Sequence, residues 1–185
     1  MFENFLKQYP DYKVQEKPTL ETIEKYKDFL PKEIIDFWSN YGFGTYMSGY
    51  LKVVNPSDFE DILKDSYVPI YQNPVVMFAT AMSDLIIWEN GYTILLDYRH
   101  GTSKVLESGF KYFIEDLCDK EFLHSDLLGE NYFPAKEKLG EPAFDESYGY
   151  VPLLGLGGAE KVENLQKVKL NEHIAIVAQA LGKIG

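Results

Sequence analysis

Hydrophobic residues near the start of the chain recur at the spacing of two amphipathic helices. Thr19 is a favourable N-cap, so the first helix is predicted to start at the next residue and to end at Leu30, because a proline follows. Pro31 suits the beginning of a second helix over residues 32–41, and Gly42 is a typical stop. One face of this second helix carries three large hydrophobic residues, which we expect in the core: Ile34, Phe37 and Trp38.

Short hydrophobic runs in the middle of the chain predict β-strands. Five such runs lie at residues 51–54, 75–80, 84–89, 92–97 and 104–106. Asn90-Gly91 tolerates positive φ and predicts a two-residue hairpin turn between the third and fourth runs. Strands that follow one another through short turns form an antiparallel sheet, so the pattern disfavours a parallel nucleotide-binding sheet.

Helical spacing returns in the last part of the chain, over residues 110–128 and again over residues 171–181. We therefore expect an α+β fold, with a mainly antiparallel sheet flanked by helices, in a single globular unit that has a helical C-terminal part. Within this unit, residues 1–106 are expected to form an α+β domain. Residues 107–185 are expected to form a mostly helical domain packed on the first.

Charge is distributed unevenly along the chain. The 185 residues carry a net charge of −11, and residues 107–146 hold 11 acidic against 4 basic residues. This balance disfavours nucleic acid and anionic membranes as direct partners and favours a basic protein. No segment approaches the roughly 18 continuous apolar residues of a membrane span, and the N-terminus lacks a secretion signal. We therefore expect a cytoplasmic protein.

Residues with the chemistry of metal or nucleotide sites are sparse. Cys118 is the only cysteine, which excludes an intramolecular disulfide and a multi-cysteine metal site. The three histidines lie in different predicted elements without metal-ligand spacing, so we expect no metal and no cofactor. The glycine-rich segment 155–158 lacks the third glycine and the Lys-Ser/Thr pair of phosphate-binding loops, which favours a backbone role.

Carboxylates are too numerous for the sequence to single out a catalytic pair, and we expect no catalytic residue. Asp84, Glu89 and Asp97 flank the predicted hairpin strands, where solvated faces are the usual place for such groups. Acidic residues and loop tyrosines are instead expected to bind a partner protein: Asp116, Asp119, Glu121, Asp126, Glu130, Tyr132, Tyr148 and Tyr150. The alternative for the tyrosines is that they tie loops to the core.

Two parts of the chain resemble known bacterial families. The first resembles the GAD-like domain through LPKEIIDFWSNYGFG at residues 30–44, GYL at 49–51 and VNP at 54–56. The second resembles the domain that usually follows it, through YGYVPLLGLGG at residues 148–158, VENL at 162–165 and Glu172-His173. Together they resemble the immunity proteins that neutralise type VI secretion DNase effectors. The first part is also similar to the broader SUKH-type immunity proteins.

This resemblance implies that residues 1–106 are a GAD-like domain and residues 107–185 a C-terminal immunity-type domain. It implies a cytoplasmic antitoxin without catalysis, which binds and inhibits a cognate secreted nuclease. The net charge agrees, because an acidic protein presents carboxylates where a nuclease expects phosphates. The family motif residues are mostly glycine, proline and apolar, so an architectural role is expected for them.

Two other functions are compatible with the residues alone. One is a small-molecule enzyme that uses a carboxylate pair in a cleft, which predicts a concave pocket with convergent, perturbed carboxylates. The other is a non-catalytic adaptor for another basic protein. An immunity protein predicts an exposed acidic and aromatic face instead. The sequence leaves open which toxin is bound and whether the protein forms oligomers.

Overall fold

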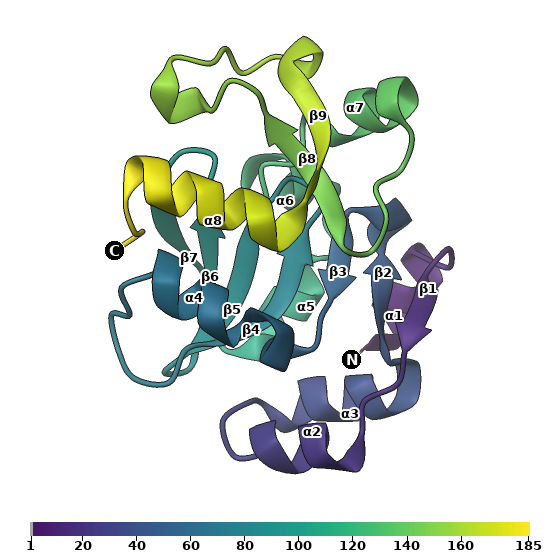
Figure 1. Ribbon diagram of the computed structural model, residues 1–185. Helices are drawn as coiled ribbons and strands as arrows, with labels where there is room; N and C mark the ends of the chain where they lie inside the picture. Colours follow the sequence, from purple (N-terminus) through teal and green to yellow (C-terminus); the bar gives the residue numbers. More distant parts are fainter. Residues whose placement is uncertain (1) are drawn as a thin grey trace.

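Seven strands form one antiparallel sheet in which the order along the chain is also the order in space (Figure 1). The computed structural model describes residues 2–185. The strands are β1 (Lys13–Glu16), β2 (Phe43–Tyr46), β3 (Leu51–Val53), β4 (Val75–Thr80), β5 (Leu85–Glu89), β6 (Tyr92–Asp97) and β7 (Thr102–Ser108). This meander confirms the predicted α+β class with a mainly antiparallel sheet.

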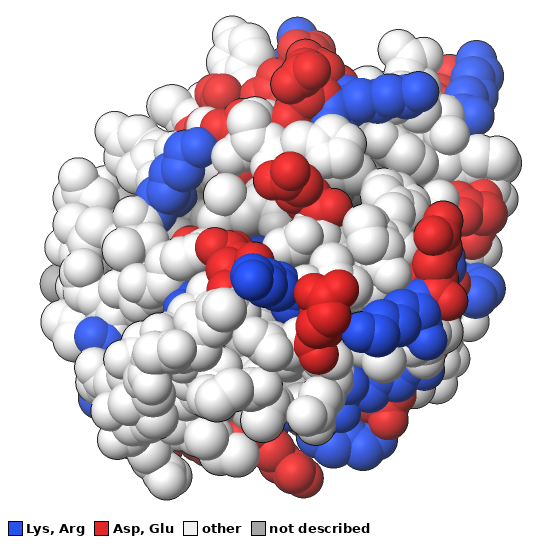
Figure 2. Space-filling model, turned by 90° about the horizontal axis from the view of Figure 1, so that it is seen from above, with Lys and Arg blue, Asp and Glu red and all other residues white. Residues whose placement is uncertain are grey.

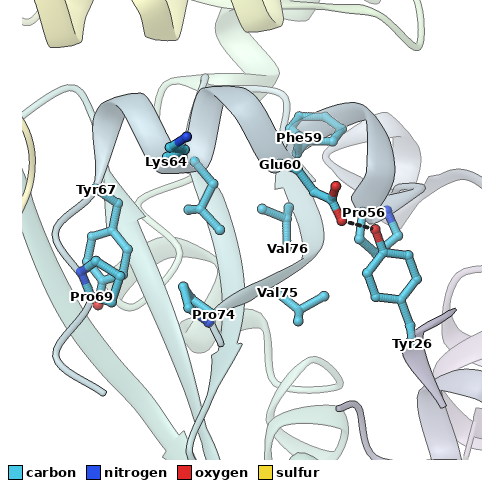
Figure 3. Close-up of a pocket in the computed structure, with 11 residues that line it drawn as sticks. Tyr26, Pro56, Phe59, Glu60, Lys64, Tyr67, Pro69, Pro74, Val75 and Val76 are labelled. Atoms are coloured by element: carbon cyan, nitrogen blue, oxygen red, sulfur yellow. Dashed lines mark hydrogen bonds between the residues drawn. The ribbon is translucent and has the colours of Figure 1, made fainter. Parts of the chain in front are cut away.

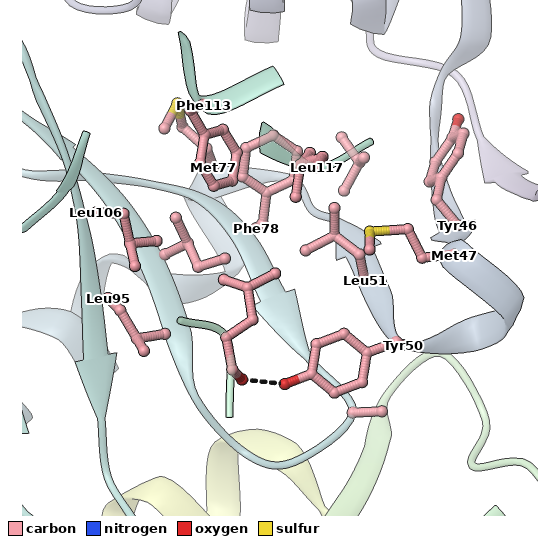
Figure 4. Packing of buried hydrophobic residues seen from close by; sticks show 14 of the residues in the cluster. Tyr46, Met47, Tyr50, Leu51, Met77, Phe78, Leu95, Leu106, Phe113 and Leu117 are labelled. Carbon is pink, nitrogen blue, oxygen red and sulfur yellow. Dashed lines mark hydrogen bonds between the residues drawn. The ribbon is translucent and has the colours of Figure 1, made fainter. Parts of the chain in front are cut away.

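Helices cover both faces of this sheet because its central strands are apolar on both faces. Alternate residues of β6 show the two layers. Ile94 packs in one cluster with Ile174 of α8 (Leu170–Leu181), on the side that also carries α4 (Glu60–Ser66). Leu95 packs in the other cluster with Phe113 of α5 (Phe110–Asp116), as seen in Figures 1 and 4. The sheet is therefore the middle layer of three.

The hairpin predicted around Asn90-Gly91 is present. Asn90 has φ 50° and Gly91 has φ 89°, as a type I′ turn requires. Glu89 faces Tyr92 directly across the turn, and the pairing continues between β5 and β6 without interruption. The Asn90-Gly91 turn therefore determines the register of the central hairpin.

The first helices also follow their local signals, with one difference. The side chain of Thr19 caps α2 (Leu20–Tyr26) by accepting a hydrogen bond from the Thr22 N–H. This helix ends at Tyr26 rather than at Leu30, because the Tyr26 carbonyl accepts the N–H groups of both Phe29 and Leu30 in a tight turn. Helix α3 (Lys32–Tyr41) buries its three predicted core residues: Ile34, Phe37 and Trp38.

Trp38 offers a direct test of this core. Its ring is fully buried between Tyr26 and Phe43, and its Nε1 has no hydrogen-bond partner among the described residues. Trp38→Phe therefore loses packing volume but no hydrogen bond, and should lower the free energy of unfolding by about 1–2 kcal/mol. Urea unfolding of the variant and of the natural protein measures the difference. An unchanged midpoint would contradict the packing described for this residue.

The C-terminal half contains strands as well as helices. After α5 come α6 (Lys120–Ser125), α7 (Tyr132–Leu139), β8 (Glu146–Tyr150), β9 (Leu165–Lys169) and α8. Strands β8 and β9 form a separate two-stranded antiparallel sheet that the hydrophobic pattern did not predict. No described helix is long and apolar enough to cross a membrane.

Buried hydrogen bonds join this half to the large sheet. Lys52 of β3 is fully buried, and its Nζ donates to the carbonyls of Ala143 (2.9 Å) and Phe144 (3.1 Å) just before β8. Burial lowers the pKa of Lys52 to about 8. One hydrophobic cluster extends from Phe5 to Leu165, so the two halves share a core within a single unit. The domain boundary at residues 106 and 107 stays a prediction.

Candidate partner-binding site

Three carboxylates from three elements gather beside the last strand of the large sheet. Glu107 lies on β7, Asp116 is the last residue of α5, and Asp126 follows α6. The Asp116 carboxyl group lies next to that of Glu107 and near that of Asp126. Asp126 forms an ion pair with Lys104 of β7 at 2.5 Å. We call the surface of Glu107, Asp116 and Asp126 the acidic face.

The charges of the acidic face are not balanced within the described residues. Burial, together with the hydrogen bond and charge of Glu107, raises the pKa of Asp116 to about 6. Lys104 is already engaged by Asp126, and neither Glu107 nor Asp116 forms an ion pair with any residue from 2 to 185. Asp116 also sits at a helix C-terminus, where negative charge is unfavourable. A cationic group of a partner protein would therefore be attracted to this surface.

The other predicted acidic residues, on α6 and in the loop that follows it, have different local roles. Asp119 caps α6, because its Oδ1 accepts a hydrogen bond from the Glu121 N–H at 2.9 Å. Glu121 lies in the first turn of the same helix, where negative charge is favourable. Glu130 is exposed in the loop before α7. Partner contacts by these residues stay a prediction.

The three predicted tyrosines are not surface residues, and that expectation was wrong. Tyr132 and Tyr148 are fully buried and Tyr150 is 2% exposed. The Tyr132 hydroxyl donates to the Ser48 carbonyl (2.9 Å), and the Tyr148 hydroxyl donates to the Gly140 carbonyl (2.6 Å). The rings therefore hold α7 and β8 in the core, which is the alternative role considered for them.

The exposed aromatic residue near the acidic face is Tyr112, which was not predicted. It is 58% exposed on α5, whereas Phe110, Phe113 and Ile114 of the same helix are buried. Helical spacing was the signal that could have identified it, since residue 112 falls on the face opposite the buried ones. Its ring adds apolar contact area beside the carboxylates.

The carboxylates next to the hairpin are buried, contrary to the expectation of solvated faces. Asp84 and Glu89 have no exposed surface, and Asp97 is 5% exposed. Asp84 forms a buried ion pair with Arg99, the only arginine of the chain. The Nε and Nη2 atoms of Arg99 donate hydrogen bonds to the two carboxylate oxygens of Asp84. Glu89 accepts hydrogen bonds from the Tyr67 hydroxyl and the Tyr71 N–H. These partners lie 15 to 22 residues away in the sequence and compensate the burial of the carboxylates.

Arg99 also positions the segment that carries the acidic face. Its Nη1 donates to the carbonyl of Leu128 at 2.9 Å. The Tyr50 hydroxyl donates to the neighbouring carbonyl of Leu127, the contact marked in Figure 4. Two side chains of the large sheet region thus hold the backbone just after α6. The sequence pattern did not single out Arg99 for this role.

The hollows of the described chain differ in size and in the carboxylates that lie beside them. Burial raises the pKa of Asp84 to about 6, although the Arg99 guanidinium opposes the shift. The cavity that Arg99 lines measures about 10 Å³, at the lower limit for one water molecule. A larger hollow of about 310 Å³ lies between α4 and β4 (Figure 3). Its carboxylate, Glu60, is paired with Lys25 and Tyr26, which lower its pKa.

The described part of the chain contains no cluster of possible metal ligands. No group of three or more histidine, cysteine, aspartate or glutamate residues in positions 2–185 is arranged to hold an ion. His100 lies between two carboxylates, with Nδ1 at 2.7 Å from Asp97 and Nε2 at 3.2 Å from Glu160. These carboxylates raise the pKa of His100 against the opposing effect of its burial. The arrangement links β6 to the loop after β8.

Comparison with known protein families finds matches over almost the whole chain. Residues 1–99 match the family model of the GAD-like domain, and residues 107–180 match that of the T6SS immunity protein Tdi1, C-terminal. No curated protein matches the chain. The crystal structure of Atu4351 from Agrobacterium tumefaciens is similar, with a TM-score of 0.83 and 22% identity over 97% of this chain and 89% of that chain. At this identity the likeness shows the fold alone.

The family matches agree with the resemblance found in the sequence motifs. The GAD-like match spans more than half of the chain, and the second match covers the part that carries α5, α6 and the acidic face. The chain therefore belongs to the GAD-like family, and its C-terminal part places it among the immunity proteins of type VI secretion.

Proposed function

We propose that this immunity protein acts in the cytoplasm, where it binds a basic nuclease toxin through the acidic face and blocks its access to DNA. The observation that carries the proposal is the pair formed by Glu107 and Asp116. These two carboxyl groups lie next to each other and form no ion pair with any of residues 2–185. A lysine or arginine of the toxin would supply the missing charge.

The distribution of charge over the surface supports this location. Figure 2 shows the molecule from above, where blue and red side chains lie interspersed. Several carboxylates of the C-terminal half outside the acidic face are paired, as Asp145 is with Lys169 (2.7 Å) and Glu141 with Lys136 (2.7 Å). Mixed charges of this kind attract no particular sign of partner. At the acidic face, by contrast, Glu107 and Asp116 form no ion pair within residues 2–185, so this surface attracts a basic protein.

Apolar contacts are available next to these charges. Tyr112 is 58% exposed on α5 and lies four residues before Asp116, on the same side of that helix. Interfaces combine such aromatic and aliphatic contacts with a polar rim, and the apolar part slows dissociation. The charged groups chiefly accelerate association. This division explains how one small surface could provide both a fast encounter and a long-lived complex.

Toxin binding should become tighter as the pH rises from about 5 to about 7.5. The pKa of Asp116 in the free protein is raised to about 6, and a cationic toxin side chain would lower it again, so binding releases a proton. Calorimetric titration across this range measures the affinity and the proton release. Asp116→Asn is the control, because it should flatten the dependence. A natural protein whose affinity falls over the same interval would contradict the assignment.

The function itself is tested with the nuclease encoded beside this gene. The purified protein should form a stable complex with that nuclease and suppress DNA cleavage at stoichiometric concentration. Co-expression should protect cells from the toxin. If the protein binds that nuclease and leaves its cleavage unchanged, it acts as an adaptor. If it binds no basic protein at all, the acidic face has another role.

A further inference from the structure

The outer edge of β7 is a free sheet edge. β7 is the outermost strand on its side of the large sheet and, at seven residues, the longest strand of that sheet (Figure 1). Its pairing with β6 is regular from Thr102 to Val105, and an extra residue, Leu106, then interrupts it before Glu107. The regular part therefore offers a short row of backbone groups on its open side.

The hairpin register determines which backbone groups point outward. The type I′ turn makes Glu89 and Tyr92 a hydrogen-bonded pair, so alternate residues of β6 beginning at Thr93 bond to β7 instead. Their partners in the regular part, Thr102 and Lys104, use their N–H and C=O groups inward. The N–H and C=O groups of Ser103 and Val105 consequently face away from the sheet. No turn or loop hydrogen bond of the described chain uses them.

Features that usually protect an edge strand are weak along this row. A lysine on an edge repels incoming strands, but the Nζ of Lys104 is held by Asp126 at 2.5 Å. The strand contains no proline, and Val105 in its regular part is 51% exposed. The bulge at Leu106 lies toward the end of the strand and leaves Ser103 and Val105 in regular pairing.

We propose that the toxin adds a β-strand of its own to the open edge of β7, bonding to the outward backbone groups of Ser103 and Val105. This inference rests on the proposed function and specifies how the same partner is held. Strand addition provides affinity through main-chain hydrogen bonds, and side chains next to the strand provide specificity. The added strand should carry a lysine or arginine on the α5 side, where it would meet Glu107.

A second copy of this chain fits the same edge less well. Pairing of two β7 edges would bring two acidic faces together, each with the unbalanced carboxylates of Glu107 and Asp116. Like charges brought together in an interface are unfavourable and suppress that pairing. A basic toxin strand has the complementary charge.

Two substitutions at Val105 distinguish the contribution of its main-chain N–H to binding from the contribution of its side chain. Val105→Pro removes the outward N–H, which an edge strand tolerates because that group makes no bond within the sheet. Val105→Ala shortens the side chain and keeps the N–H. With the nuclease encoded beside this gene as the probe, Val105→Pro should bind roughly tenfold more weakly or worse, and Val105→Ala within about threefold of the natural protein.

Hydrogen exchange on the natural protein tests the same bonds without a substitution. The Ser103 and Val105 amides should exchange quickly in the free protein and become protected in the complex. Exchange that stays fast in the complex, or equal binding by all three proteins, would overturn strand addition and leave the proposed function standing. Protection in the free protein that increases with its concentration would show a second copy on this edge and also overturn it. If the natural protein fails to bind the nuclease, the proposed function and this inference both fall.

Discussion

Reversal of Glu107, Asp116 and Glu121 to lysine should slow association with a basic toxin by about 10- to 1,000-fold. These three carboxylates form no ion pair within the described chain and do not cap a helix, so the fold should survive their replacement. Exposed charges contribute at most ~1 kcal/mol each to stability, whereas their summed field acts on every encounter. Asp119 and Asp126 are left unchanged, because one caps α6 and the other holds Lys104.

The measurement is the association rate at two salt concentrations, with thermal unfolding as the check on folding. The matched control reverses Glu21, Glu33 and Asp61, three exposed carboxylates on α2, α3 and α4 that form no ion pair within residues 2–185. Both variants change the net charge equally. Equal slowing by the two variants would show that overall charge, and not the acidic face, steers the toxin. Unaltered kinetics in both would place the interface on uncharged surface.

Replacement of Arg99 by methionine should lower the free energy of unfolding by about 3–5 kcal/mol. The variant leaves the carboxylate of Asp84 buried without its cation, and it leaves the carbonyl of Leu128 without its donor. Loss of a buried partner is more damaging than loss of an exposed ion pair, because water cannot replace it. Since Arg99 holds the backbone after α6, the acidic face should also become more mobile.

The pH dependence of this loss follows from Asp84. Burial raises its pKa to about 6, so in the natural protein the protonated form contributes stability in acid that disappears as the pH rises through that value. Without Arg99 the pKa of Asp84 should rise further. The variant should therefore lose more stability at pH 8 than at pH 5.

Urea unfolding at both pH values measures the effect. The double variant Asp84→Asn with Arg99→Met is the control, because it removes the unpaired charge and should recover part of the stability and most of the pH dependence. Equal stability of Arg99→Met and the natural protein would show that this pair does not hold the sheet to the loop after α6.

Local signals predicted elements well where neighbouring residues alone decide the conformation. The start of α3 after Pro31, its end at Gly42 and the Asn90-Gly91 turn are examples, because a helix end or a two-residue turn depends on a few consecutive residues. The same signals misplaced Tyr132 and Tyr148. Their hydroxyls are paired with carbonyls of other segments, and β8 carries no alternating pattern because both of its faces are buried.

The sequence by itself determined the α+β class, the acidic character of the chain and the family resemblance, since these depend on composition, short periodic patterns and consecutive motif residues. Only the tertiary structure decided which charges act together. Asp84 and Arg99 are neutralised inside the protein, whereas Glu107 and Asp116 meet on its surface without a cation. Such pairings arise when distant segments pack against each other, and electrostatic energy depends on separation in space and on access to water rather than on distance along the chain.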